Sequence, residues 1–348
     1  MTAATSPKTS FDADYRKMLQ TLSEGSVHVH FDPYEDIDWD APDMAIDPED
    51  PRWILPADFD PLGATAWYQS LPIDRQIELG QWRILNIIKV GAAFESALIR
   101  GLMHYAMELP NGSPEFRYCL HEMTEECNHI QMFQELVNRS GVDVPGTRTH
   151  FRLMLPFLGL FGGFQPVLLM IGILGGEEPI DHYQKIAIRS LELPPALQRV
   201  MEIHIAEEAR HISFAVAFLK MRLPHANRFQ RFHLSLAFPI TMRWLAGEIM
   251  TPPGSLAKRF GIPADVYKEA FWDSPKSREI LASYFGDMRA LAEETGLMNP
   301  VSRRLWKRLG IAGEASRYRG EPERTAEFFT DDALQPPARA GVPADRAA

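Results

Sequence analysis

The sequence has little cysteine, no surplus of basic residues and no apolar segment at its N-terminus. Its 348 residues include two cysteines, Cys119 and Cys127. They form no CxxC pair and cannot build a disulfide framework, which favours a reduced, cytoplasmic setting. Acidic residues outnumber basic ones by 46 to 36, and the net charge of −10 argues against a general nucleic-acid-binding protein. The first residues lack the apolar core of a secretory signal.

One stretch is unusually apolar. Residues 153–174 carry no charged side chain over a length that could span a membrane. Pro156, Gly162, Gly163 and Pro166 divide the stretch into two shorter apolar pieces. Membrane helices tolerate such residues, so a membrane contact stays open as an alternative. A buried helical core is the favoured interpretation.

Strand-like alternation of polar and apolar residues is missing, and apolar residues instead recur at helical spacing. Prolines and glycines punctuate these runs as helix starts and stops. Long helices are predicted at 72–109, with a possible break at Gly80, and at 115–140, 166–193 and 195–224. Further helical pieces are predicted around 226–250, 264–272, 275–296 and 299–308. The fold class is therefore all-α.

Composition divides the chain into three parts. Residues 1–64 are expected to form an irregular acidic arm, because acids and prolines crowd residues 32–61 and prolines prevent a continuous helix there. Residues 65–310 form the main domain. Residues 311–348 form a C-terminal extension whose low-complexity end we expect to be disordered.

Two predicted helices carry similar triplets of metal-binding residue types. In both, the residues follow the spacing i, i+4, i+7, and the last two form Glu-x-x-His. At about 100° per residue, each triplet occupies one narrow stripe of its helix. Stacked carboxylates are rarely buried unless a cation neutralises them. The triplets are Glu122, Glu126 and His129, and His204, Glu208 and His211.

The helix that precedes each triplet contributes a further glutamate amid apolar residues. Glu95 lies in the first long helix, and Glu177 or Glu178 in the third. One glutamate from each of two helices and a Glu-x-x-His from each of two others are the ligands of ferritin-like di-iron or di-manganese bundles. Carboxylate and imidazole ligands suit iron and manganese. The pattern predicts a ferritin-like four-helix bundle core with additional helices.

These residues resemble the p-aminobenzoate N-oxygenase (AurF-like) family of non-haem di-iron oxygenases. The histidine one turn before the second Glu-x-x-His, in the segment HIAEEARH at 204–211, distinguishes that family from plain ferritins. The segment GLMNPVSRRLWKRLGI at 296–311 is also similar. The resemblance covers roughly residues 65–310 and leaves the acidic arm and the tail outside.

The resemblance implies a set of metal ligands for two iron ions, with manganese as the alternative metal and O2 as the co-substrate. Glu177 or Glu178 completes the set, and the spacing to His204 slightly favours Glu177. Glu122 is not required by the family pattern, which leaves it a supporting or a surface role. The remaining implied ligands are Glu95, Glu126, His129, His204, Glu208 and His211.

The resemblance also implies a reaction. Such an enzyme would activate O2 and oxidise a small arylamine through hydroxylamine and nitroso stages toward a nitro compound. It would take electrons from an external donor of reductase or ferredoxin type and would form a homodimer. Two other functions stay open: a di-iron oxidase, hydroxylase or desaturase acting on another small organic or acyl substrate, and a ferritin-like iron-binding protein.

Overall fold

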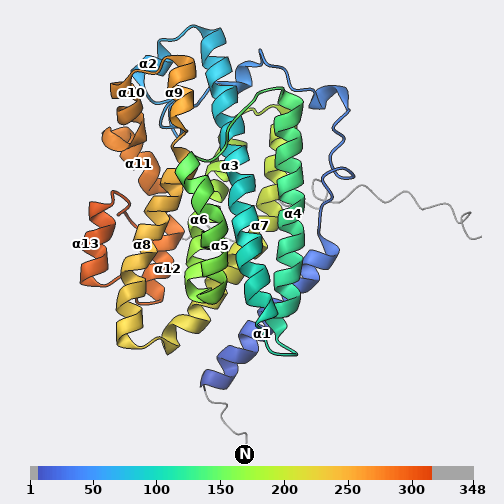
Figure 1. Ribbon diagram of the computed structural model, residues 1–348, viewed down its shortest axis with the longest axis vertical. Coiled ribbons are helices and arrows are strands. Elements are labelled where there is room, and N and C mark those ends of the chain that lie inside the picture. The colour runs from blue at the N-terminus through green and yellow to red at the C-terminus, as the bar shows by residue number, and fades with distance from the viewer. Residues whose placement is uncertain (1–6, 316–348) are drawn as a thin grey trace, which may run out of the picture.

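Four long helices form a bundle along the long axis of the molecule (Figure 1). The computed structural model describes residues 7–315, and all regular structure in that range is helical. Helix α3 packs on α4 and α6 packs on α7, while contacts of α4 with α7 and of α3 with α6 close the bundle. This confirms the predicted all-α, ferritin-like fold. The four helices are α3 (Ile73–Met107), α4 (Pro114–Ser140), α6 (Pro166–Ser190) and α7 (Pro195–Arg222).

The ends of these helices follow from local sequence. Pro114, Pro166 and Pro195 each begin a helix, where the missing N–H of proline has no helical partner to lose. Helix α4 ends at Ser140 and is followed by Gly141, whose φ of 67° is left-handed. The sequence therefore predicts these boundaries to within a few residues.

Helix α3 passes unbroken through Gly80, where a break was considered possible. Gly80 is needed because another segment lies directly against it. A Cβ atom on Gly80 would sit 1.9 Å from the carbonyl oxygen of Trp53. Trp53 belongs to the short helix η2 (Pro51–Trp53) and is fully buried. The glycine therefore allows the N-terminal arm to pack on the bundle.

The expectation of an irregular N-terminal arm is wrong for its first part. Helix α1 (Pro7–His28) packs against α4 and α7. The acids and prolines that prevent a helix are concentrated after residue 31, whereas α1 contains buried Tyr15 and Leu19. Residues 29–65 then form a strap over the bundle, interrupted by η1 (Pro42–Met44) and η2.

A buried ion pair fastens the strap to two helices. Asp60 accepts a hydrogen bond of 2.7 Å from Nε of Arg83 in α3, and both side chains are almost inaccessible. Arg83 also donates to the carbonyl oxygen of Met250, at the end of α8 (Arg228–Met250). The strap, α3 and α8 therefore share one charged contact.

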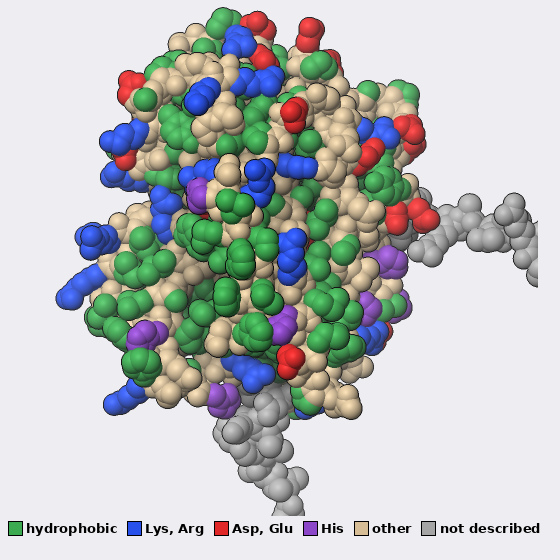
Figure 2. Space-filling view, in the orientation of Figure 1, with side chains coloured by type: hydrophobic (Ala, Val, Ile, Leu, Met, Phe, Trp, Pro, Cys, Tyr) green, Lys and Arg blue, Asp and Glu red, His purple; other side chains and the backbone are tan. Residues whose placement is uncertain are grey.

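The apolar stretch 153–174 is divided at Gln165 between α5 (Thr149–Phe164) and α6. The expectation of a buried core is wrong for the outer face of α5, where Leu153 and Phe161 are 68% and 65% exposed. Apolar side chains gather over α5 in Figure 2. Only one side of this helix faces α3 and α6, so the other stays uncovered. Within the described residues, no helix has the length and apolar character needed to cross a membrane.

Shorter helices complete the described chain beside α8 (Figure 1). The helix predicted at 275–296 is two helices, because the chain turns at Tyr284 and Phe285. The predictions for the far C-terminal tail lie outside the described residues. The remaining elements are α2 (Ala66–Gln69), η3 (Leu223–His225), α9 (Gly254–Phe260), α10 (Ala264–Lys268), η4 (Glu269–Asp273), α11 (Pro275–Ser283), α12 (Gly286–Glu294) and α13 (Pro300–Arg308).

Replacing Gly80 with alanine should destabilise the protein by about 1–3 kcal/mol, because the new methyl group overlaps a backbone oxygen that cannot rotate away. The matched control is Gly172→Ala in α6, where no atom lies within 4 Å of the added Cβ. That variant should be neutral or up to about 1 kcal/mol more stable, since alanine favours a helix. Denaturant unfolding measures both. Equal stability of the two variants would contradict the proposed contact between α3 and the strap.

Candidate metal centre

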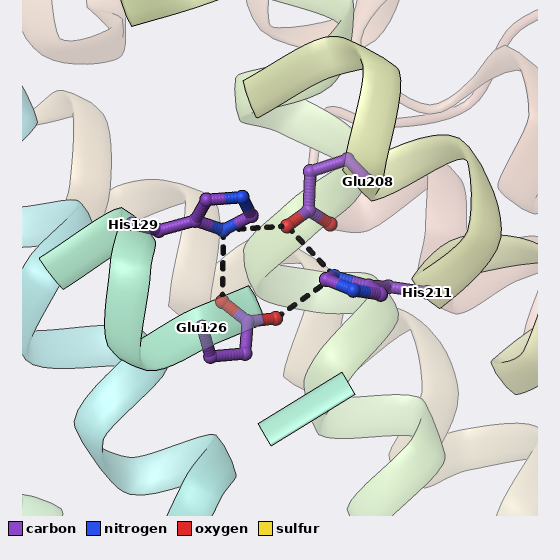
Figure 3. A group of neighbouring side chains, drawn as sticks. All are labelled: Glu126, His129, Glu208 and His211. Carbon is purple, nitrogen blue, oxygen red and sulfur yellow. Dashed lines mark hydrogen bonds and ion pairs between the residues drawn. The ribbon is translucent and has the colours of Figure 1, made fainter. Parts of the chain in front are cut away.

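The two Glu-x-x-His motifs face each other across the centre of the bundle (Figure 3). Glu126 and His129 come from α4, Glu208 and His211 come from α7, and all four side chains have no exposed surface. His129 Nδ1 lies 3.2 Å from Glu126 and 3.6 Å from Glu208. His211 Nδ1 lies 3.0 Å from Glu126 and 3.1 Å from Glu208. Each carboxylate therefore lies between both imidazoles, as a bridging ligand would.

The other two bundle helices bring further ligand types to the same place. Oε1 of Glu95, from α3, lies 3.4 Å from His204 Nε2 and 4.0 Å from His129 Nδ1. Glu177, from α6, forms a group with His204 and Glu208 in which the potential ligand atoms lie within 4.8 Å of one another. Seven of the eight residues named from the sequence therefore converge.

Glu178 is the eighth. It is buried, at 4% exposure, but belongs to none of the potential metal-binding groups among the described residues. Neighbouring residues of a helix point about 100° apart, so one of the pair must face elsewhere. The geometry favours Glu177 at this position.

Each histidine contacts the cluster with one ring nitrogen and an outer partner with the other. His129 Nε2 lies 2.8 Å from Glu207 of α7, and His211 Nε2 lies 2.7 Å from Glu125 of α4. Each outer carboxylate thus comes from the helix opposite its histidine. Such partners fix the orientation of an imidazole and strengthen its binding to a metal.

Other polar contacts hold the outer partners. Nη2 of Arg210 lies 2.8 Å from Glu125 and 3.6 Å from Glu207, so one guanidinium serves both carboxylates. His204 Nδ1 lies 2.8 Å from Oε1 of Gln184. Sequence reasoning missed Glu125, Glu207 and Gln184. The available signal was the Glu-Glu doublet at the start of both motifs, EECNH and EEARH.

The strap also reaches this outer layer. The backbone N–H of Phe31 donates to Oε1 of Glu207, at 3.2 Å. The side-chain amide of Asn128 donates to the carbonyl oxygen of Phe31, at 3.1 Å. One strap residue therefore links α4 and α7 immediately outside His129.

The cluster concentrates negative groups where water cannot solvate them. Burial is the main cause that raises the pKa of Glu95 and Glu177 well above the ordinary range, and it raises that of Glu208 as well. Burial acts in the same direction on Glu126, but neighbouring imidazoles, chiefly that of His211, outweigh it and lower the pKa. Carboxyl groups in such surroundings ionise readily only when cations lie between them.

The donor set fits divalent cations. Oε2 of Glu95 and Oε2 of Glu208 are buried without a hydrogen-bond partner, although buried polar atoms normally have one. No cysteine takes part in the groups among the described residues, whereas structural zinc sites prefer thiolates. Carboxylate oxygens together with imidazole nitrogens suit iron or manganese.

Glu122 is also buried, so a surface role for it is wrong. Neither of its carboxylate oxygens has a hydrogen-bond partner. Burial is the largest cause that raises its pKa well above the ordinary value. It lies one helical turn before Glu126 but belongs to none of the potential metal-binding groups in the described chain.

Comparison with known proteins agrees with this geometry. The family model described as p-aminobenzoate N-oxygenase AurF matches residues 12–296. The chain belongs to this family. The AurF family is a ferritin-like family of di-iron oxygenases. Because the match begins within α1, the estimate that left the N-terminal arm outside the resemblance was wrong, and the strap is part of the family region.

Close relatives share nearly the whole chain. An uncharacterised protein of Mycobacterium bovis and another of Mycobacterium tuberculosis are each 56% identical over 314 residues, which cover 90% of this chain and 92% of the relative. No solved structure matches the chain significantly. The family assignment therefore supplies the class of chemistry, and the relatives add no substrate.

Replacing Glu125 or Glu207 with glutamine should lower metal affinity by about 10- to 100-fold while the fold is retained, because each histidine loses a charged partner on its outer nitrogen. Competition between the protein and a chelator for iron(II) measures the affinity. The control is Glu202→Gln, a partly exposed position on α7 away from the cluster. Unchanged affinity in both outer-layer variants would contradict their orienting role.

Proposed function

We propose that the protein is a non-haem di-iron monooxygenase that N-oxygenates a small arylamine. The observation that carries the proposal is the convergence of carboxylates and imidazoles from four helices at one buried centre. The family assignment supports a di-iron oxygenase, and the N-oxygenase type follows from the family description. The proposed ligands are Glu95, Glu126, His129, Glu177, His204, Glu208 and His211.

The chain's own residues give this centre its shape. Glu126 and Glu208 each lie near both His129 and His211, so their carboxylates would help to hold cations bound there. Glu95 approaches both His129 and His204, and Glu177 lies near His204 and Glu208. Iron ions bound there would supply the capacity to bind and reduce O2. The bundle shields the centre from bulk solvent and holds the imidazoles in fixed orientations.

The balance of the reaction implies a partner. An amine, O2, two electrons and two protons give a hydroxylamine and water. We therefore propose an external electron donor of reductase or ferredoxin type. Repeated oxidation would lead through a nitroso compound toward a nitro compound. Both cysteines are unpaired, which supports the proposed cytoplasmic location.

The competing functions use the same centre. A hydroxylase, oxidase or desaturase would act on a different organic or acyl substrate, and an iron-binding protein would accumulate metal without substrate-dependent O2 uptake. Manganese is the alternative metal, since its ligand preferences overlap with those of iron. Measured metal content and substrate-dependent O2 uptake separate these possibilities.

Reconstituted protein should bind about two iron ions per chain, the number held by ferritin-like di-iron bundles. Glu177→Ala and His211→Ala should reduce the bound iron, whereas Glu178→Ala should retain it, because Glu178 lies outside the ligand groups. Elemental analysis measures the content. Full iron binding by Glu177→Ala together with loss in Glu178→Ala would reverse the ligand assignment.

With an arylamine and an electron donor, the loaded protein should consume O2 and form a hydroxylamine. Mass spectrometry detects that product. Oxidation of an acyl substrate with arylamines untouched would instead select the competing enzyme class.

We also propose a homodimer. The uncovered apolar face of α5, which includes Leu153, Phe157 and Phe161, supports association because burying such a patch is favourable. Phe157→Glu should convert the dimer to a monomer, as measured by light scattering. The control Phe229→Glu changes another exposed phenylalanine, on α8. A wild-type monomer, or a dimer that survives Phe157→Glu, would contradict this assignment.

A further inference from the structure

A small void opens onto one side of the candidate centre. It is lined by Glu95, Glu177 and His204, and its volume is about 20 Å³. That is room for roughly one water molecule. A second hollow, beside His129 and beneath Phe31, has no room for a water molecule. An organic substrate must therefore enlarge a space before it reaches the centre, and the first void is the better starting point.

The rest of the void's wall is apolar. It consists of Phe94, Phe133, Ile180 and Ile249 together with two glycines. The glycines allow the rings to lie directly on the helix backbones. A Cβ atom on Gly176 would sit 3.1 Å from the ring of Phe94, and one on Gly91 would sit 3.1 Å from the ring of Phe133.

The residues that line the void include no lysine, arginine or hydroxyl group. Its polar atoms belong to proposed metal ligands, and two of those ligands are carboxylates. An anionic group on a substrate would be desolvated there without a cationic side chain to pair with, and this opposes its binding.

Phe94 separates the void from a second apolar cluster. Its side chain is half-buried, and its ring stacks on Phe151 of α5 with centroids 5.0 Å apart. Phe151 in turn packs edge-on against Trp244 at 5.5 Å. Phe94 therefore packs on one side against the residues of the void and on the other against this aromatic cluster. Arg148, which precedes α5, pairs with Glu248 at 2.6 Å.

We propose that the substrate is an arylamine without an anionic group, and that Phe94 is the residue that selects it. This inference rests on the proposed function, since it specifies which amine reaches the centre. Such a substrate differs from p-aminobenzoate, the compound named in the family's description, because p-aminobenzoate carries a carboxylate. The apolar wall accepts an uncharged ring, and the absence of a lining cation disfavours a carboxylate.

The test compares p-toluidine with p-aminobenzoate, which share a ring and an amine and differ in a methyl or a carboxylate group. Calorimetry with the iron-loaded protein, kept free of O2, measures binding separately from oxidation. Wild-type protein should bind p-toluidine at least tenfold more tightly. Equal or tighter binding of p-aminobenzoate, or failure to bind p-toluidine, would overturn the inference.

A variant locates the selectivity. Phe94→Lys places an ammonium group at a half-buried position of the wall, where its aliphatic stem can replace part of the ring. It should shift the affinity ratio toward p-aminobenzoate by about tenfold. The control Phe229→Lys makes the same chemical change at a position that is 73% exposed. Phe229 lies at the start of α8, whereas Ile249 of the void lies at its end, so this variant should leave the affinity ratio of the two amines unchanged. An unchanged ratio in Phe94→Lys, or equal shifts in both variants, would exclude Phe94 as the selecting residue.

Turnover distinguishes this inference from the proposed function. If p-toluidine binds preferentially but the reduced protein does not oxidise it or other uncharged arylamines, the specificity stands and the N-oxygenase proposal fails. If p-aminobenzoate is both preferred and oxidised, the N-oxygenase proposal stands and the inference about the substrate fails.

Discussion

The structure depends on placing several carboxylates together where bulk water does not solvate them. Glu95, Glu126, Glu177 and Glu208 are all buried at the centre of the bundle. Uncompensated, such a group of charges would oppose folding, because each loses hydration and repels its neighbours. Divalent cations bound among the carboxylates would replace their mutual repulsion with attraction. The free energy of metal binding would then also stabilise the folded state. The bundle must then hold the ligands rigidly, which explains the second layer of contacts around the histidines.

That outer layer of contacts joins α4 to α7. Glu125 of α4 supports a histidine of α7, Glu207 of α7 supports one of α4, and Arg210 lies near both carboxylates. A change in the separation of the two helices would therefore disturb both histidines together. Phe31 adds a backbone contact from the strap to the same layer. The inclusion of α1 and the strap in the family match fits this direct contact with the outer layer.

Helical periodicity predicted the long helices, and the repeated Glu-x-x-His spacing indicated which face of each helix carries ligand types, because both patterns are set by residues a few positions apart. Contacts between distant segments were not accessible in this way. From the sequence alone, Gly80 is compatible with a break in the helix. Its actual role, to make room for the carbonyl oxygen of Trp53, depends on a segment that is distant in the sequence. The choice between Glu177 and Glu178 needed the rotation of α6 relative to its neighbours. Helix α1 was missed because the acidic, proline-rich composition of residues 32–61 was extended to the whole arm.

The two halves of the bundle are related by a repeated motif but are not equivalent. His204 lies one turn before Glu208, and Glu122 lies one turn before Glu126. His204 approaches both Glu95 and Glu208, whereas Glu122 remains outside the ligand groups with its oxygens unpartnered. Helix α7 therefore contributes one more imidazole to the centre than α4 does. His204 also lines the void, so the void opens on the side of the centre that holds this additional histidine. A substrate that entered there would meet His204 and Glu95 before it reached His211.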